Sequence, residues 1–362
     1  MAKAAAGSPV AVGFASPEGF ESLPSPPIFC EGLLYSFVNG VGEPPRQLGF
    51  WHGMAKGKRI MRKTVKVCDR DIRVGGRLLR FAQPHGDRYR FLDDPAAVVN
   101  ALRQCGTRVD LFSFAQRLPE TKPIYPYAME WDNYAVLPIS TFENWWTHQI
   151  GFKARNKAKQ AEKRGVSLRE VPFDEVLVKG IWEIYNECPI RQRRRFPHYG
   201  KSTETIYREE ATFLESSVFI GAYHADKLIG FVKIVIDETG TQAGLMNIVS
   251  MIRHRDKAPQ NALIAQAVRA CASRGIQFLV YSKFAYGKKQ QDSLSDFKER
   301  NGFKRVDLPR YHVPLTRMGW LALRLGLHHP FAERIPESLA AKLRDLRAAW
   351  YARRYGSMSE AF

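Results

Sequence analysis

The chain has 362 residues, of which 45% are hydrophobic and 12% aromatic. This apolar content is enough to bury a core, so a wholly disordered protein is excluded, and the length suits two globular domains or one large one. Lys and Arg number 55 against 36 Asp and Glu, giving a net charge of +19. The excess favours an anionic partner such as nucleic acid, a phosphorylated substrate, coenzyme A or an acidic membrane face. A basic protein kept soluble by its charge is the alternative.

The cysteines and histidines predict neither a disulfide framework nor a metal site. Five cysteines are scattered without CxxC spacing, which fits free thiols in a reducing cytosol. Nine histidines are spread out, and the pair His328-His329 has no companion ligands. No run approaches the roughly 18 apolar residues of a membrane-spanning helix, and the N-terminus lacks the apolar stretch of a secretory signal. These features predict a cytoplasmic protein.

The first part of the chain predicts an α/β region behind a flexible arm. Residues 1–27 are rich in Ala, Gly, Ser and Pro, which is typical of an arm without regular structure. Within residues 28–142, Gly75-Gly76 predicts the turn of a hairpin, and a helix is expected over 94–106, beginning at Asp94. Strands are expected at 109–115 and 134–139.

A strongly basic stretch follows at the start of the region 143–316. Its cations are Lys153, Arg155, Lys157, Lys159, Lys163 and Arg164, with Glu162 as the only carboxylate among them. Helical spacing places Arg155, Lys159 and Lys163 on one face. Because an ordinary surface helix mixes charges, the one-signed stretch predicts a docking site for an anion, and a solvated helix face is the alternative.

Residues 166–315 then predict a regular α/β succession. Strands are expected at 166–171, 244–251, 276–284 and 304–315, with a hairpin at 218–237; helices are expected at 173–188, 203–216, 262–274 and 292–303. Because strand 244–251 is apolar throughout, it should be central, and the helical crossover predicts that 276–284 runs parallel to it. Strand 304–315 contains two prolines and is therefore predicted at the edge of the sheet.

This order of elements over residues 150–316 resembles the GNAT acyltransferases, and in detail their Fem-type branch. The basic helix Arg155 to Lys163 leads into Arg164-Gly165-Val166, and Phe297-Lys298 precedes Asn301-Gly302-Phe303. The resemblance implies an α/β (α+β) fold with a GNAT-like mixed sheet flanked by helices. Region 28–142 is interpreted as a shortened first GNAT-like half, because helix 94–106 and strand 109–115 imitate the helix–strand step at 262–284.

The resemblance also implies transfer of an acyl or aminoacyl group from a thioester or ester donor to an amine, with no permanently bound cofactor. The donor is either acyl-CoA or an aminoacyl-tRNA. Donor-binding residues are expected in the loop before helix 262–274 and on the central strand: Arg255, Lys257, Gln260, Asn261, Asn247 and Val249. This loop lacks the glycines of coenzyme-A-dependent members, so both donors stay open. A bulged central strand would offer backbone N–H groups from residues 247–250 to an oxyanion.

Catalytic and acceptor residues are assigned in the same way. Lys298 occupies the position where many coenzyme-A-dependent members carry a tyrosine, and should flank the apolar face of its helix and reach a cleft. His254 and Asp256 are the candidate bases. Acceptor-binding candidates lie in two loops: Arg191, Arg193 and Tyr199 in one, Lys283 and Tyr286 in the other. The first loop combines arginines with aromatics and suits a phosphate with a flat ring, and a mobile solvated loop is the alternative. The second loop follows the carboxyl end of strand 276–284, the end at which ligands bind in parallel sheets.

The C-terminal stretch 317–362 is amphipathic and basic. We expect it to pack on the domain, and the alternative is contact with a membrane surface, which would suit a lipid-linked acceptor. The competing function is a non-catalytic nucleic-acid-binding protein on a degenerate GNAT scaffold, with residues 153–164 as its main surface.

Overall fold

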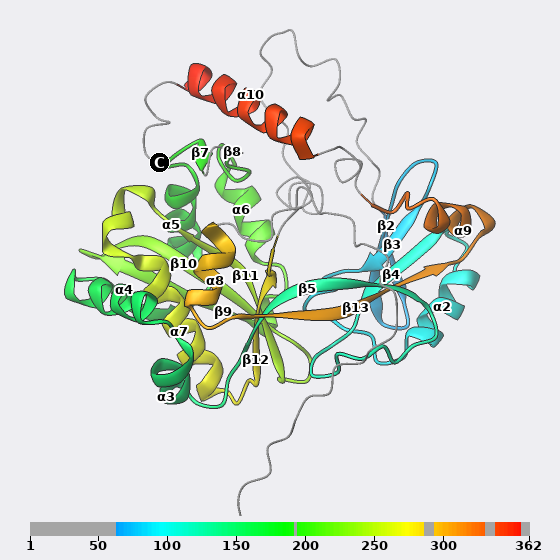
Figure 1. The fold of residues 1–362 in the computed structure, drawn as a ribbon, viewed down its shortest axis with the longest axis horizontal. Coiled ribbons are helices and arrows are strands. Elements are labelled where there is room, and N and C mark those ends of the chain that lie inside the picture. Colours follow the sequence, from blue (N-terminus) through cyan, green and yellow to red (C-terminus); the bar gives the residue numbers. More distant parts are fainter. Residues whose placement is uncertain (1–62, 192–193, 286–292, 330–336, 356–362) are drawn as a thin grey trace, which may run out of the picture.

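The computed structural model describes residues 63–191, 194–285, 293–329 and 337–355 (Figure 1). The expected arm at 1–27 therefore lies outside the described residues. One sheet of 11 strands runs through the described part, in the order β1-β2-β3-β4-β13-β5-β12-β11-β10-β9-β6. Its strands are β1 Lys63–Val67, β2 Arg70–Gly75, β3 Phe81–Pro84, β4 Leu111–Ala115, β5 Ala128–Pro138, β6 Ser167–Val171, β9 Ser217–His224, β10 Lys227–Ile236, β11 Gln242–Ser250, β12 Phe278–Lys283 and β13 Lys304–Pro314. A separate short pair is formed by β7 Ile190–Arg191 and β8 Arg194–Arg195.

Most helices lie on this sheet or pack on helices that do, whereas the last one, α10, lies apart from the sheet and contacts β8 (Figure 1). They are α2 Pro95–Gln104, α3 Phe142–Asn144, α4 Phe152–Lys163, α5 Glu175–Tyr185, α6 Thr203–Glu210, α7 Pro259–Ser273, α8 Ser293–Arg300, α9 Arg317–Arg324 and α10 Glu337–Tyr355. A π-helical turn spans Trp145–Gln149, and 3-10 turns span Leu214–Ser216 and Ile252–Lys257. None of the described helices has the length and apolarity that crossing a bilayer requires.

The C-terminal half is built as the apolar pattern predicts. β10 is buried along nearly its whole length and pairs with β9 and β11, and the hairpin turn uses Ala225 and Asp226 in left-handed conformations. α7 crosses over between β11 and β12, which pair in parallel as expected, and its apolar side chains pack into the main core. The predicted mixed sheet with a parallel crossover is therefore confirmed.

β11 and β12 separate after a short stretch of pairing. They are hydrogen-bonded only over Gln242–Gly244 and Phe278–Val280, although β11 continues to Ser250. β11 stays paired with β10 along this part, with a bulge where the register shifts between Lys233 and Ile234. The second half of β11 is therefore not hydrogen-bonded to β12, and this separation of the two strands is called the gap below.

The N-terminal half contains a smaller crossover of the same kind. Asp94 caps α2 by accepting a hydrogen bond from the Ala97 N–H at 3.0 Å, and α2 connects β3 to β4, which pair in parallel. A second core lies between α2 and these strands. The arrangement repeats the β11–α7–β12 step on a smaller scale. The division of the chain at 142 and 316, with a first GNAT-like half before it, stays a prediction.

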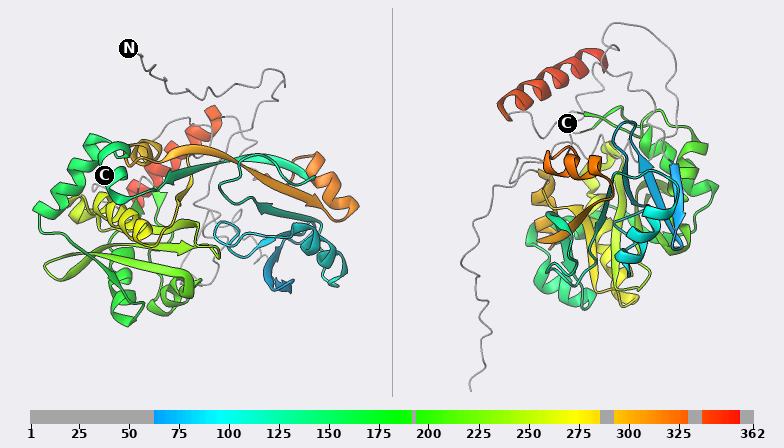
Figure 2. Two further views of the ribbon diagram at one scale, coloured as in Figure 1. Left: turned by 90° about the horizontal axis from the view of Figure 1, so that it is seen from below. Right: turned by 90° about the vertical axis from the view of Figure 1, so that its right-hand side faces the viewer.

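The expectation that 304–315 forms an edge strand was wrong. β13 lies inside the sheet between β4 and β5, and both long strands run from one half of the molecule to the other (Figures 1 and 2). The Pro309 carbonyl accepts from the Gln116 N–H, so the nitrogen of Pro309 also faces β4, just beyond the end of that strand. By the alternation of an antiparallel ladder, the nitrogen of Pro314 faces β5, whose pairing has ended at His312. Neither proline therefore removes a bond from a continuous ladder.

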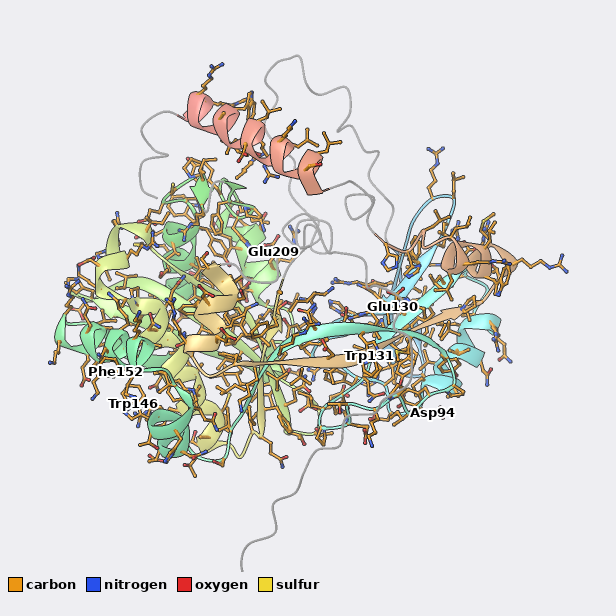
Figure 3. All side chains as sticks on the ribbon, in the orientation of Figure 1. Asp94, Glu130, Trp131, Trp146, Phe152 and Glu209 are labelled. Atoms are coloured by element: carbon orange, nitrogen blue, oxygen red, sulfur yellow. The ribbon has the colours of Figure 1, made fainter. Side chains whose placement is uncertain are left out.

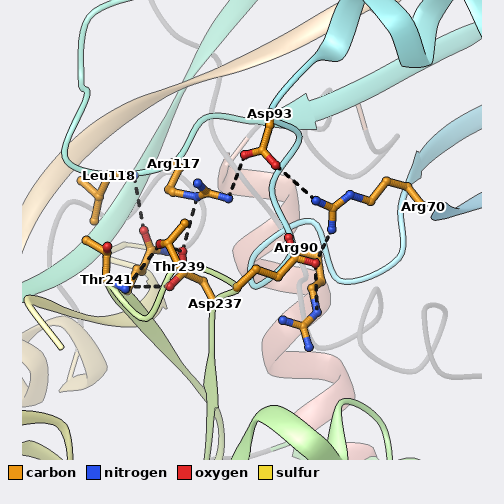
Figure 4. A network of polar contacts seen from close by, with 10 residues as sticks. Arg70, Arg90, Asp93, Arg117, Leu118, Asp237, Thr239 and Thr241 are labelled. Carbon is orange, nitrogen blue, oxygen red and sulfur yellow. Dashed lines mark hydrogen bonds and ion pairs between the residues drawn. The ribbon is translucent and has the colours of Figure 1, made fainter. Parts of the chain in front are cut away.

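Polar contacts join the two halves on one side of the sheet (Figure 4). Arg117, which follows β4, lies 3.3 Å from Asp237 at the end of β10 and 3.3 Å from Asp93 at the start of the α2 segment. The Leu118 N–H also donates to the Gln242 side chain at 3.3 Å. These contacts fix the β10–β11 turn against the N-terminal half.

Candidate functional site

A pocket of about 700 Å³ lies where α4, the start of α7 and α8 meet. Among the described residues, its cations are Lys153, Lys157, Arg255 and Arg300, and none of the described lining residues is acidic. Polar side chains from α4 and α7 complete much of the wall: Asn156, Gln160, Gln260 and Asn261. A hollow whose described lining holds four cations and no acidic group is suited to an anion.

The face of α4 that lines the pocket is not the expected one, which carries Arg155, Lys159 and Lys163. Ala154, Ala158 and Ala161 are buried and allow α4 to pack on α7, which turns Lys153 and Lys157 toward the pocket. On another face, Arg155 donates to the Thr147 carbonyl at 3.1 Å. Lys159 and Lys163 are exposed and lie outside the pocket lining.

Two hydrogen bonds tie the segment that leads into α4 to the end of α8. The Gly151 N–H, just before α4, donates to the Arg300 carbonyl at 2.8 Å. The indole nitrogen of Trp145 donates to the Asn301 carbonyl at 2.9 Å. Because both acceptors lie at the end of α8, the two helices are set at a fixed separation across the pocket.

The N-terminus of α7 opens into this pocket without a side-chain cap. Ala258 precedes the helix in a left-handed conformation with φ of 52°, and Pro259 is its first residue. The backbone N–H groups of the first turn therefore have no side-chain acceptor at Ala258, and they carry the positive end of the helix dipole. Ala258 takes the conformation that glycine favours, so the loop turns sharply here without a glycine.

Three of the residues expected to bind the acyl donor lie together on the pocket wall, and a fourth lies away from it. Arg255, Gln260 and Asn261 line the pocket. Lys257 is not part of the lining, and its ammonium lies 3.3 Å from the Asp256 carboxylate. Arg164 at the end of α4 donates to the Asp256 carbonyl, so this loop is tied to the basic helix.

The two candidate bases also lie on this loop, outside the pocket lining. Asp256 is exposed beside Arg164 and Lys257. Burial, followed by the charges of Lys257 and Arg253, lowers the pKa of His254, which favours the neutral imidazole that a base requires. The loop is anchored by Glu187, whose carboxylate accepts from the N–H groups of Ile252 at 2.6 Å and Arg253 at 3.1 Å. The sequence did not indicate this role of Glu187.

The end of β11 connects the pocket with the gap beside β12. Ser250 lines the pocket, and the next residue, Met251, donates its N–H to the Ile229 carbonyl at 2.7 Å. Because hydrogen-bonded pairs alternate along an antiparallel ladder, Val249 directs its backbone groups toward β10, and Ile248 and Ser250 direct theirs toward the gap. The backbone N–H groups that could bind an oxyanion in the gap are therefore those of Ile248 and Ser250, whereas that of Val249 is directed toward β10.

Asn247 belongs to a buried polar cluster behind β11. Its amide donates to both oxygens of Glu210 at 2.8 and 3.0 Å, and Glu210 also accepts from the Tyr185 hydroxyl at 2.9 Å. The Lys233 ammonium donates to the carbonyls of Glu210 at 2.6 Å and Thr212 at 2.7 Å. Burial raises the pKa of Glu210 and lowers the pKa of Lys233 to about 8. Sequence reasoning missed this cluster, although Lys233 in the middle of the apolar run of β10 was a signal for it.

Lys298 is fully buried rather than beside an open cleft. Its ammonium donates to the Lys283 carbonyl at the end of β12 and lies 4.9 Å from the centre of the Tyr281 ring. β12 forms the other wall of the gap beside β11, so Lys298 supports that wall from the α8 side. The Lys283 ammonium itself lies 3.3 Å from Asp132 of β5 and does not line the pocket.

The loop expected to bind the acceptor is partly described. Arg191 donates to the Ser250 carbonyl at 2.7 Å and to the Ile184 carbonyl at 2.7 Å, and its guanidinium stacks 4.4 Å from the centre of the Phe196 ring. Tyr199 is partly exposed in the turn that follows. Neither residue lines the pocket. Arg193 and Tyr286 lie outside the described residues.

Comparison with solved structures identifies the fold. FemX superimposes with a TM-score of 0.50 at 9% identity, covering 73% of this chain and 90% of FemX. L-PGS from Bacillus licheniformis gives a TM-score of 0.48 at 13% identity, covering 73% of this chain and 88% of that one. A tandem GNAT protein from the clavulanic acid biosynthesis pathway gives 0.40 at 10% identity, covering 68% and 79%. No protein-family model and no curated protein sequence matches the chain.

The chain therefore has a GNAT-like fold of the Fem type, with a mixed α/β sheet flanked by helices. This confirms the fold class that the order of elements predicted. At 9% identity the likeness to FemX extends to the fold alone.

Proposed function

We propose that the chain is an acyltransferase that moves an acyl or aminoacyl group from a phosphate-bearing thioester or ester donor to an amine. The observation that carries the proposal is the cationic pocket, which joins the open N-terminus of α7 to Ser250 at the end of β11. The phosphates of the donor would lie among Lys153, Lys157 and Arg255, where their charge meets the helix dipole. The acyl group would extend past Ser250 into the gap.

Acyl transfer requires hydrogen-bond donors at the carbonyl oxygen, and in this proposal the backbone of β11 beside the gap supplies them. The amine attacks the carbonyl carbon, the carbonyl oxygen becomes an oxyanion, and the donor leaves as a thiol from coenzyme A or as a ribose hydroxyl from tRNA. The N–H groups of Ile248 and Ser250 face this space and would stabilise the oxyanion. In this proposal the ammonium of Lys298 adds positive charge behind β12.

The remaining assignments concern the proton and the acceptor. His254 and Asp256 remain the proposed bases, and a neutral His254 is ready to accept the amine proton. Arg191 positions the end of β11, since both of its terminal nitrogens donate to backbone carbonyls. Tyr199 is left as the proposed contact to an acceptor that carries a phosphate or a lipid.

The donor is either acyl-CoA or an aminoacyl-tRNA, because both carry phosphates as well as an activated carbonyl. The test is a thermal-stability screen of the purified protein with acetyl-CoA, coenzyme A, aminoacyl-tRNA and uncharged tRNA. It is followed by detection of acyl transfer to a panel of amines by mass spectrometry. The proposal predicts stabilisation by one donor class and a new amide product. Absence of any product from both donor classes would contradict it.

A non-catalytic nucleic-acid-binding protein is the competing function. It is favoured by the exposed cations Lys159 and Lys163, which extend the charge of α4 beyond the pocket. Binding by phosphate contacts weakens steeply with salt and does not depend on an activated ester. Equal affinity for charged and uncharged tRNA, with no turnover, would favour this function over the transferase.

A further inference from the structure

Three histidines and a glutamate meet on the ribbon formed by β5 and β13. Glu130 of β5 pairs with Arg310 of β13, and His312 lies two residues further along β13. Directly opposed residues share a face of the sheet, as do residues two apart, so Glu130 and His312 project from the same face. Figure 3 places Glu130 on this ribbon, on the other side of the molecule from Phe152 at the start of α4.

The other two histidines arrive from the turn that ends α9. Gly326 has a φ of 63°, the Leu327 N–H donates to the Ala322 carbonyl at 2.8 Å, and the Gly326 N–H donates to the Leu323 carbonyl at 3.0 Å. This is the hydrogen-bonding pattern of a Schellman motif, which reverses the chain direction. The reversal places His328 Nε2 2.8 Å and His329 Nε2 3.1 Å from Glu130 Oε1.

His312 is left without a hydrogen bond in this cluster. Its side chain is only 7% exposed, and its Nε2 lies 3.6 Å from Glu130 Oε2, beyond hydrogen-bond distance. Within the described part of the chain, neither ring nitrogen of His312 has a hydrogen-bond partner, and the same holds for Nδ1 of His328. Buried polar atoms are normally paired, so His312 Nε2, which faces the carboxylate, indicates a missing partner.

We propose that Glu130, His312 and His328 bind a divalent transition-metal ion, with His329 as a fourth ligand. The ligand atoms of Glu130, His312 and His328 lie within 4.8 Å of one another, close enough to contract onto one ion. Imidazole nitrogens with one carboxylate oxygen, four ligands in all, form a donor set that suits Zn²⁺. The ion would fasten the α9 turn to the β5–β13 ribbon, away from the donor pocket, so this proposal is independent of the proposed function.

This proposal differs from the expectation that the chain has no metal site. The other ligands lie far from His328-His329 along the chain, so the sequence does not show them as companions. The fold supplies one ligand from β5 and another from β13, which are distant in sequence from each other and meet only by strand pairing.

The test uses the full chain without an affinity tag, stripped with a chelator and dialysed. Titration with Zn²⁺ should show one ion bound per chain and a higher melting temperature, and Mg²⁺ should give neither. Co²⁺ should give the intense visible absorption of a tetrahedral site, a measurement on the wild-type protein that needs no folded variant. The substitutions His312→Gln and His328→Gln should each weaken Zn²⁺ binding by about 100-fold or more, and His148→Gln, at an exposed histidine elsewhere, should leave it unchanged.

Two results would overturn the proposal. One is the absence of stoichiometric Zn²⁺ uptake together with a Co²⁺ spectrum typical of the hydrated ion. The other is uptake that the H312Q and H328Q variants retain in full while circular dichroism shows them folded. Either outcome would make the cluster a set of histidines grouped around one carboxylate without a metal ion.

Discussion

Arg191 donates a hydrogen bond at 2.7 Å to the carbonyl of Ser250, the last residue of β11. Its other terminal nitrogen donates to the Ile184 carbonyl in α5, also at 2.7 Å. One guanidinium thus holds the end of the central strand against a helix, at the point where β11 has separated from β12 and Ser250 lines the cationic pocket. The position of the backbone N–H groups that face the gap depends on this link.

Replacement of Arg191 by Lys tests the link. A lysine keeps the charge but cannot bond both carbonyls at once, and loss of a hydrogen bond from a charged donor is worth about 1.5–3 kcal/mol. We expect R191K to lower the melting temperature by several degrees and to lower kcat for the proposed transfer. The control is R195A, at an exposed arginine nearby, which should change neither. A normal kcat in R191K would show that the strand end is positioned without Arg191.

Lys298 is proposed to stabilise the oxyanion with its positive charge from a buried position behind β12. The substitution Lys298→Met removes its charge but keeps its length, and loss of one group that stabilises an oxyanion lowers kcat by roughly 10²–10³-fold. Because Lys298 is buried and bonded to the Lys283 carbonyl, the same change should also lower the melting temperature. Donor affinity should stay unchanged, since Lys298 does not line the pocket. A folded K298M protein with normal kcat would remove this assignment.

The cluster around Glu210 predicts a rescue experiment. The Asn247 amide donates to both Glu210 oxygens, so Glu210→Gln sets two amide groups against each other and should destabilise the protein by about 1–3 kcal/mol. Adding Asn247→Asp restores a donor and an acceptor in reversed positions. Chemical denaturation of the single and double variants should show that E210Q/N247D recovers part of the lost free energy of unfolding. A double variant less stable than E210Q would contradict the direct contact.

Two histidines should make the fold sensitive to acid. Burial, followed by the charges of Lys201 and Arg191, lowers the pKa of His198 to about 3, and burial and the charge of Arg73 lower the pKa of His85 to about 4. The unfolded chain binds these protons near pH 6.5, so the stability from the two neutral side chains is complete above that pH and is lost as the pH falls. Each contributes a slope of up to about 1.4 kcal/mol per pH unit.

The matched variants for this prediction are His198→Gln and His148→Gln. Unfolding free energies measured between pH 6.5 and 4.5 should fall less steeply for H198Q than for the wild type. H148Q, at an exposed histidine, should follow the wild-type curve. Identical slopes for all three proteins would show that His198 titrates normally in the folded state.

The sequence predicted the elements better than their contacts. The α7 crossover followed from local patterns, because an apolar strand, a helix and a second strand permit few arrangements. The face of α4 did not follow from the charges, but Ala154, Ala158 and Ala161 mark the buried side and would have indicated Lys153 and Lys157. The position of β13 inside the sheet could not be predicted, because it depends on which neighbouring strand each proline nitrogen faces. The burial of Lys298 could not be predicted either, because it depends on a contact with the Lys283 carbonyl in another segment.

The central claim is that an anionic donor binds in the pocket between α4, α7 and α8, and two double variants on one helix test it directly. K153A/K157A removes two pocket cations, and K159A/K163A removes the same charge from exposed positions outside the lining. Donor affinity is measured by isothermal titration calorimetry with whichever donor stabilises the wild type. A charge-assisted hydrogen bond is worth about 1.5–3 kcal/mol and about 1.4 kcal/mol is tenfold in affinity. The account therefore predicts a loss of about 100-fold or more for K153A/K157A and less than about threefold for K159A/K163A, and equal losses in the two variants would contradict it.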